Sequence, residues 1–187
     1  MSLFLGIDFG TTGVRSSIID KNKKELINFS VSIDSPISKG SLVYQNPSLW
    51  WNALIKNLTF LKTKIEFNKI ERLSIDGTSG TVLITDHLGN PLDDALMYND
   101  ASAVKESKLV ESISDNHPIV STSTNALVRA LSLINKLKKE KYRILHQADW
   151  IACKIIDDYM YSDENNALKL GYDCLLYTSP SPRDQCL

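Results

Sequence analysis

A turn after the first apolar run of the chain holds residue types that could bind phosphate and a divalent cation. Asp8 precedes Gly10, Thr11, Thr12 and Gly13. Glycines let backbone N–H groups approach phosphate oxygens closely, threonine hydroxyls add donors, and a carboxylate at a strand end can hold Mg²⁺ directly or through water. The spacing is neither that of a Rossmann fingerprint nor that of a Walker loop. This turn predicts a polyphosphate site with Asp8 at the metal; the alternative is a glycine-rich hairpin whose Asp caps the turn.

A second turn of similar composition, residues 76–81, contains Thr78, Ser79 and Gly80 and also follows an apolar strand. In open α/β sheets, ligands gather outside the carboxyl ends of the strands, so polar loops from separated parts of the chain can converge on one crevice. The two turns are therefore candidates for one site. The alternative for this segment is a tight turn between adjacent strands, in which the hydroxyls satisfy local backbone groups.

Three later polar clusters, at residues 98–100, 147–150 and 163–172, suit helix capping as well as ligand binding. Asn and Asp are favoured N-caps, and Trp150 is more often a core anchor than a stacking partner for a ligand. Spacing alone makes none of these clusters catalytic.

The elements that position the first turn follow from the hydrophobic pattern. Residues 3–7 form an apolar run, and residues 27–33 alternate with period two. Residues 14–19 suit a helix as well as a strand, but the polar turn at residues 20–24 favours a hairpin. The pattern predicts a meander of three antiparallel strands.

A helix and a further strand place the second turn beside the meander. Asn46 and Pro47 supply an N-cap and a first-turn proline for a helix whose apolar positions extend to Ile65. Strand, helix and strand in this order imply a crossover onto a central sheet. Further strands are predicted at residues 70–75 and 81–85. Three more helices are predicted: one begins after a cap at Asn99 or Asp100, one spans residues 126–139, and one begins after a cap at Asp149.

Composition favours a globular protein with small-molecule partners. Of 187 residues, 43% are hydrophobic, and 21 basic residues nearly balance 22 acidic ones, so no strong field points to nucleic acid or a membrane surface. No apolar stretch approaches the roughly 20 residues that cross a bilayer, and a cytoplasmic protein is expected. His87, His117 and His146 are far apart, which gives a zinc site little support. Cysteines 153, 174 and 186 have no CxxC spacing, so reduced thiols are expected.

In their order along the chain, the polar segments resemble the FGGY family of carbohydrate kinases, whose members share the actin-like, ribonuclease H-like ATPase fold. The similarity spans most of residues 3–173 and is greatest to the pentulose kinases known as D-ribulose kinases. The matching segments are LGIDFGTTGVR, SIDGTSGTVL, MYND, QADW and NALKLGYD. The expected fold class is an incomplete α/β domain, in which a mixed sheet contains the antiparallel meander and is joined by crossover helices.

The resemblance implies roles for residues in each segment. Asp8 and the turn from Gly10 to Gly13 would face the ATP phosphates and Mg²⁺. Many members have an Arg shortly after the aromatic-Asn-Asp element, whereas this chain has Ala101 and Ser102 there, which is compatible with the ribulokinase-like group. The residues expected to border or approach the sugar are Thr78, Ser79, Gly80, Asn99 or Asp100, Asp163 and Asn166.

The implied reaction is transfer of the ATP γ-phosphoryl group to a primary hydroxyl of a ketopentose, with D-ribulose preferred to D-xylulose. In the family the base is an Asp in a later Gly-Thr-rich segment, so no catalytic residue is assigned here. Two alternatives stay open. The first turn also resembles the opening of heat-shock chaperones, which are actin-like ATPases, and a ribonuclease H-like nuclease would use Asp8 and Asp76 in a two-metal cluster.

The end of the chain departs from the pattern of the rest. Residues 174–187 replace helical periodicity with a Ser-Pro repeat. This segment resembles the translated adapter-like tails found on chains predicted from assembled sequencing reads, and the alternative is a genuine flexible terminus. We expect the kinase domain to occupy residues 1–173 and the tail to be non-native. Family members are more than twice as long, so this chain is expected to lack activity by itself.

Overall fold

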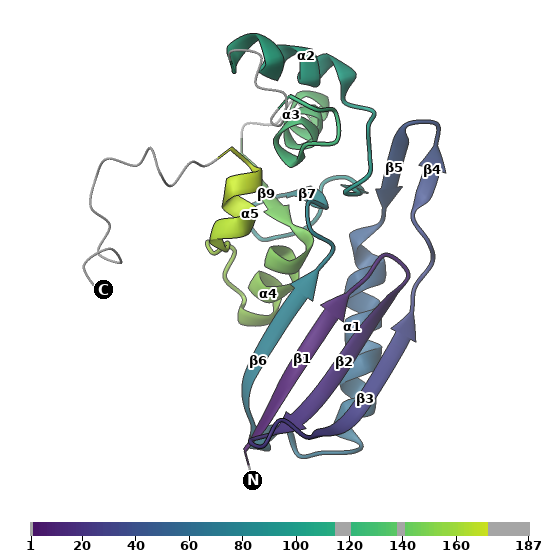
Figure 1. Cartoon of the computed structure of the whole chain (residues 1–187), viewed down its shortest axis with the longest axis vertical. Helices are drawn as coiled ribbons and strands as arrows, with labels where there is room; N and C mark the ends of the chain where they lie inside the picture. Colours follow the sequence, from purple (N-terminus) through teal and green to yellow (C-terminus); the bar gives the residue numbers. More distant parts are fainter. Residues whose placement is uncertain (1, 115–120, 138–140, 172–187) are drawn as a thin grey trace, which may run out of the picture.

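Within residues 2–114, 121–137 and 141–171, which the computed structural model describes, the chain forms a four-stranded and a five-stranded β-sheet (Figure 1). Three sequence-based expectations concern residues outside these ranges. They are the non-native tail at residues 174–187, the role of His117, and the reduced state of Cys174 and Cys186. In the described part, Cys153 is buried and its thiol is free. No helix there is long and apolar enough to span a bilayer.

The first sheet contains the predicted meander. Its strands lie in the order β3-β2-β1-β6, with β1, β2 and β3 antiparallel and β6 parallel to β1. The turn between β2 and β3 is fixed by Asp20, whose carboxylate accepts the N–H groups of Asn22 and Lys24 at 2.8 and 3.0 Å. The strands span Leu3–Phe9 (β1), Gly13–Asp20 (β2), Glu25–Ser32 (β3) and Ile70–Gly77 (β6).

Helix α1, Pro47–Lys62, makes the crossover and covers one face of this sheet (Figure 1). It begins as predicted, because the Asn46 side chain accepts the N–H of Ser48 at 2.8 Å and proline occupies the first turn. The alternation of β1 points Leu5, Ile7 and Phe9 into the core shared with α1 and leaves Asp8 exposed on the opposite face. The candidate phosphate turn therefore lies at the end of a strand whose other side is anchored in the core.

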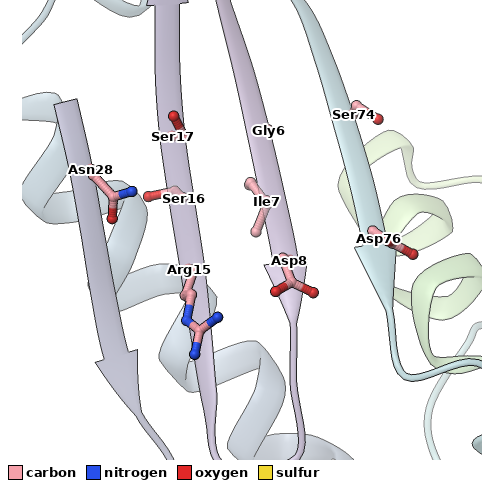
Figure 2. Close-up of a pocket in the computed structure, with 9 residues that line it drawn as sticks. All are labelled: Gly6, Ile7, Asp8, Arg15, Ser16, Ser17, Asn28, Ser74 and Asp76. Carbon is pink, nitrogen blue, oxygen red and sulfur yellow. The ribbon is translucent and has the colours of Figure 1, made fainter. Parts of the chain in front are cut away.

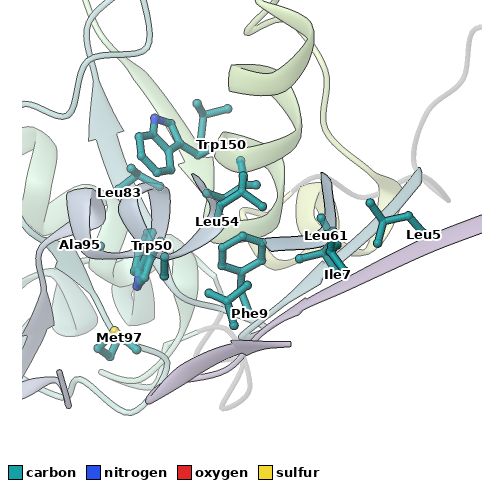
Figure 3. Packing of buried hydrophobic residues seen from close by; sticks show 14 of the residues in the cluster. Leu5, Ile7, Phe9, Trp50, Leu54, Leu61, Leu83, Ala95, Met97 and Trp150 are labelled. Carbon is teal, nitrogen blue, oxygen red and sulfur yellow. The ribbon is translucent and has the colours of Figure 1, made fainter. Parts of the chain in front are cut away.

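Two tryptophans join α1 to helix α4, Gln147–Ile156, in this core (Figure 3). The rings of Trp50 and Trp150 meet edge to face with centroids 6.1 Å apart. Each indole N–H has a partner: Trp50 donates to Gln45 Oε1 at 2.7 Å and Trp150 to the carbonyl of Gly89 at 2.8 Å. Trp150 is thus a core anchor and not a stacking partner for a ligand, as the sequence favours.

The second sheet has the strand order β4-β5-β8-β7-β9 and was only partly predicted. The strand expected at residues 81–85 is β7, but it pairs with β8 and β9 and does not join the meander. Of the other strands, β9 lies between segments predicted as helices, and β4, β5 and β8 lie in segments for which no element was predicted. They span Ile37–Lys39 (β4), Leu42–Gln45 (β5), Val82–Thr85 (β7), Ala95–Leu96 (β8) and Arg143–His146 (β9), and a 3₁₀ turn spans Phe67–Lys69 (η1).

The remaining helices begin differently from the predicted caps. Helix α2, Val104–Ile113, starts after Ala103 without a side-chain cap, because the Asp100 carboxylate is used elsewhere. Asp149 lies in the first turn of α4 and does not cap it. Helix α3 spans Ala126–Leu137. The sequence predicts it to residue 139, but residues 138 and 139 lie outside the described ranges. Helix α5 spans Glu164–Lys169.

Candidate active site

The carboxylates of Asp8 and Asp76 lie on neighbouring strands, near the carboxyl end of each strand in the first sheet. The parallel ladder of β1 and β6 pairs these two residues directly, and Arg15 is the ladder partner of Asp8 on β2 (Figure 2). Adjacent strands are about 4.8 Å apart. Together with Ser74 and Asn28, these side chains line a hollow of about 320 Å³ on the face of the sheet opposite α1. The two strands that lead into the predicted turns are therefore neighbours, but this hollow is lined by strand residues and by none of residues 10–13 or 78–80.

The turn between β1 and β2 is tightly built. Gly10 donates its N–H to the carbonyl of Gly13 at 2.9 Å. The carbonyls of Thr11 and Thr12 accept from Gln45 Nε2 and from the N–H of Ile33, at 3.1 and 3.0 Å. Because two carbonyls of this turn accept hydrogen bonds from other segments and a third closes the turn on itself, its position relative to Asp8 is fixed.

The turn between β6 and β7 is anchored to β1 and to α4. Thr78 donates its hydroxyl to the carbonyl of Phe9 at 3.1 Å and its N–H to Gln147 Oε1 at 2.7 Å. A Cβ on Gly77 would lie 3.1 Å from Gln147 Oε1 and 3.2 Å from the N–H nitrogen of Ala148, so a larger residue would crowd this close approach of the turn to the helix. Thr78, predicted to border the sugar, thus also holds the two turns together.

A second cleft, of about 350 Å³, lies between this turn and α5. The predicted residues Thr78, Ser79, Asp163 and Asn166 line it, and Asp76 lines both this cleft and the hollow beside Asp8. Lys169 reaches from α5 across the cleft and donates to the Ser79 hydroxyl. The two polar cavities therefore meet at the Asp76 carboxylate.

The wall formed by α5 is fixed by a buried hydrogen-bond network. Asn166 donates its side-chain amide to Asp149 at 2.9 Å and to Asp163 at 2.7 Å, and Asp163 caps α5 by accepting the Asn166 N–H at 2.9 Å. His146 Nε2 lies 3.1 Å from the Asn166 carbonyl. Burial lowers the pKa of His146, although the nearby Asp149 opposes this shift, so the ring is neutral at neutral pH.

The cluster at residues 98–100 divides into exposed and buried parts. Tyr98 and Asn99 are exposed beside the second turn. Asp100 is fully buried, and its carboxylate accepts the Val43 N–H at 2.7 Å and the Ser102 hydroxyl at 2.9 Å. Asn99 is thus the member of the predicted pair whose side chain is open to solvent, whereas Asp100 joins this loop to β5.

Gly80, the remaining predicted residue, is buried against a side chain that sequence reasoning missed. Its backbone has φ +83°, and its carbonyl accepts from Arg129 Nη2 at 2.6 Å. Burial lowers the pKa of the Arg129 guanidinium to about 10, partly offset by Asp100, so it stays protonated at neutral pH. The available signal was a charged residue within the helix predicted at residues 126–139, whose other buried side chains, Ala126, Val128, Ala130 and Leu133, are apolar.

The donor set suits a cation that keeps part of its water shell. Within the described residues, no group of three or more His, Cys, Asp or Glu side chains could enclose a metal ion. Mg²⁺ is usually held by one or two carboxylates together with waters and substrate phosphates. Asp8 and Asp76 supply two carboxylates on an open sheet face, and this fits such a partly hydrated ion better than an all-protein metal site.

Residues 3–163 match the N-terminal domain of the FGGY family of carbohydrate kinases. The chain belongs to this family. A xylulose kinase of Staphylococcus xylosus is 23% identical over 179 residues, which cover 89% of this chain and 36% of the relative. Sugar kinases of the family are phosphotransferases that bind a sugar and ATP, typically with a metal ion.

Solved structures of the family share the fold of this chain. The xylulose kinase of Rhodospirillum rubrum superposes with a TM-score of 0.70 at 16% identity, over 81% of this chain and 33% of that one. The glycerol kinase of Plasmodium falciparum, solved with ADP, gives 0.69 at 17% identity over 90% and 37%. The expected actin-like ATPase fold is confirmed. The chain spans about a third of the length of these relatives.

Proposed function

We propose that this chain forms part of an ATP- and Mg²⁺-dependent kinase that phosphorylates a ketopentose, with D-ribulose preferred to D-xylulose. The observation that carries the proposal is the ladder pair of Asp8 and Asp76, which stands where the two polar cavities meet. A kinase needs its phosphate and sugar sites to adjoin, because the γ-phosphorus must lie in line with the attacking hydroxyl.

The chain's own residues would bind and orient the reactants. The turn from Gly10 to Gly13 would supply backbone and hydroxyl donors to the phosphates, and Asp8 would hold Mg²⁺, with Asp76 as a second carboxylate beside it. The bound ion would neutralise phosphate charge. The cleft lined by Thr78, Ser79, Asp163 and Asn166 would receive the sugar. Gly80 and Asn99 do not line this cleft and would approach the sugar from their loops.

In the proposed reaction, the substrate hydroxyl oxygen forms a bond to the γ-phosphorus while the bond from that phosphorus to ADP breaks. A carboxylate accepts the hydroxyl proton. We do not assign this base to Asp8, because Asp8 is proposed to hold the metal and the base of the family is an Asp in a later Gly-Thr-rich segment. The base would come from a part of the enzyme beyond the 187 residues, so this chain alone would bind ligands without turning them over.

The test uses a protein in which this chain continues to the length of its relatives, called here the extended protein. Coupled measurement of ADP release with D-ribulose, D-xylulose and glycerol should show the highest kcat/KM for D-ribulose. Asp8→Ala should abolish turnover, whereas Glu71→Ala, which removes an exposed carboxylate at the far end of β6, should leave it intact. Full activity of Asp8→Ala would overturn the role of Asp8, and ATP hydrolysis independent of any sugar would favour an actin-like ATPase.

A further inference from the structure

A charged side chain lies buried behind the proposed sugar cleft. Arg129, in the first turn of α3, is only 1% exposed. Removing a guanidinium from water is costly unless its donors are satisfied. Since no carboxylate among the described residues forms an ion pair with Arg129, its donors require partners of another kind.

The partners of Arg129 are main-chain carbonyls from two loops. Nη2 donates to Gly80 in the β6–β7 turn at 2.6 Å, and Nη1 donates to Tyr98 at 2.5 Å, with the Asp100 carbonyl at 3.5 Å. These acceptors lie 49, 31 and 29 residues away along the sequence. The planar fork of one guanidinium can bridge carbonyls that a point charge on a lysine could not span together.

The β6–β7 turn is packed directly on this fork. A Cβ on Gly80 would lie 3.3 Å from Arg129 Nη2 and 3.8 Å from the Cβ of Tyr98, so the turn, the guanidinium and the 98–100 loop are in mutual contact. Ser79 and Asn99, the chain neighbours of Gly80 and Tyr98 in these two loops, are exposed. The position of one loop backbone relative to the other is thus fixed by Arg129.

We propose that Arg129 is a positioning residue, which holds the β6–β7 turn against the 98–100 loop so that Thr78 and Ser79 keep their places in the wall of the proposed sugar cleft. This inference rests on the proposed function. Arg129 does not touch the sugar; it acts through the backbone of Gly80 and Tyr98. An apolar side chain would leave these loop carbonyls buried without donors, and the loops would shift or admit water.

The first arm of the test measures the loops themselves, by amide hydrogen exchange of the extended protein. Arg129→Met should speed exchange in residues 78–81 and 98–102 while leaving β1 and β2 protected. Leu133→Ala is the control, because it truncates another buried residue of α3 that packs in the apolar cluster with Val82 and Ile84. It should loosen α3 and β7 without a selective effect on the two loops.

The second arm measures kinetics with the best sugar found for the extended protein. Arg129→Met should raise the sugar KM about tenfold or more and leave the ATP KM nearly unchanged, since only the sugar-side loops move. Arg129→Lys keeps the charge and should give an intermediate sugar KM. The lysine variant also serves if the methionine variant does not fold.

The two arms separate failure of this inference from failure of the proposed function. Unchanged sugar KM in folded Arg129→Met, or equal rises in the two KM values, would overturn the positioning role. Unchanged exchange in the two loops would overturn it as well. If the unmodified extended protein phosphorylates no sugar, the proposed function fails, and the exchange arm still decides whether Arg129 fixes these loops.

Discussion

The hydroxyl of Thr78 donates a hydrogen bond of 3.1 Å to the carbonyl of Phe9, which ties the first residue after β6 to the last residue of β1. Phe9 leads into the turn between β1 and β2, and Thr78 begins the turn between β6 and β7. Since β1 and β6 are parallel neighbours, this bond joins the carboxyl ends of the two strands, where both turns begin.

Replacing Thr78 by valine should loosen this edge without changing the shape of the side chain. A neutral hydrogen bond of this kind contributes about 0.5–1.5 kcal/mol, so Thr78→Val should lower the free energy of unfolding by about that amount. Thr78→Ser keeps the hydroxyl and should lose less. Urea unfolding of this chain measures both variants, and equal losses for valine and serine would show that the bond contributes nothing.

Asp76→Asn should stabilise the unliganded chain while it impairs the extended protein. Two carboxylates opposite each other on adjacent strands repel, and such pairs shift stability by about 0.2–1 kcal/mol. The amide oxygen of asparagine can still accept the Gly77 N–H, a bond of 2.8 Å in the structure. We therefore expect a higher urea midpoint, a gain that shrinks with added salt, and a raised requirement for Mg²⁺ in turnover.

The matched control for this variant is Glu71→Gln, which removes a carboxylate from the same strand away from the pair. This control should shift the urea midpoint by much less than Asp76→Asn does. It should leave the Mg²⁺ requirement unchanged. A lower stability of Asp76→Asn would mean that the carboxylate pair is not repulsive in the folded chain.

Local patterns along the sequence were enough to predict the first turn and the elements around it. The cap at Asn46, the alternation of β3 and the polar turn at Asp20 all act within a few residues, so each can be recognised in a single segment. The crossover that brings β6 beside β1 follows from the order of these elements.

Contacts between distant segments decided what the sequence could not show. Asp100 is held by Val43, 57 residues away, and Arg129 by Gly80, 49 residues away, so neither role appears in any local pattern. Strands such as β8, with two residues, exist because neighbouring strands pair with them and not through their own propensity. Asp149 has a typical capping residue type but accepts from Ser162 and Asn166 instead.

Gly80→Ala should destabilise the chain by more than its backbone strain alone. A residue other than glycine pays about 1–2 kcal/mol in the left-handed region, which Gly80 occupies at φ +83°. The new Cβ would also press on Arg129 Nη2 at 3.3 Å. Gly40→Ala is the matched control, because Gly40 has φ +63° with nothing within 4 Å of a Cβ. The difference between the two urea midpoints isolates the contact, and equal losses would argue against it.

His146 should make the chain less stable in mild acid. Burial lowers its pKa below the ordinary value of 6.5, against the opposing charges of Asp149 and Asp163, while Lys169 acts in the same direction as burial. Below about pH 6.5 the unfolded chain binds a proton that the folded chain refuses, so stability present above that pH is lost as the pH falls towards the lower folded pKa. His146→Gln should flatten this part of the urea-midpoint profile, whereas His87→Gln, which removes an exposed histidine, should retain the slope. A slope that survives in His146→Gln would assign the acid sensitivity to other groups.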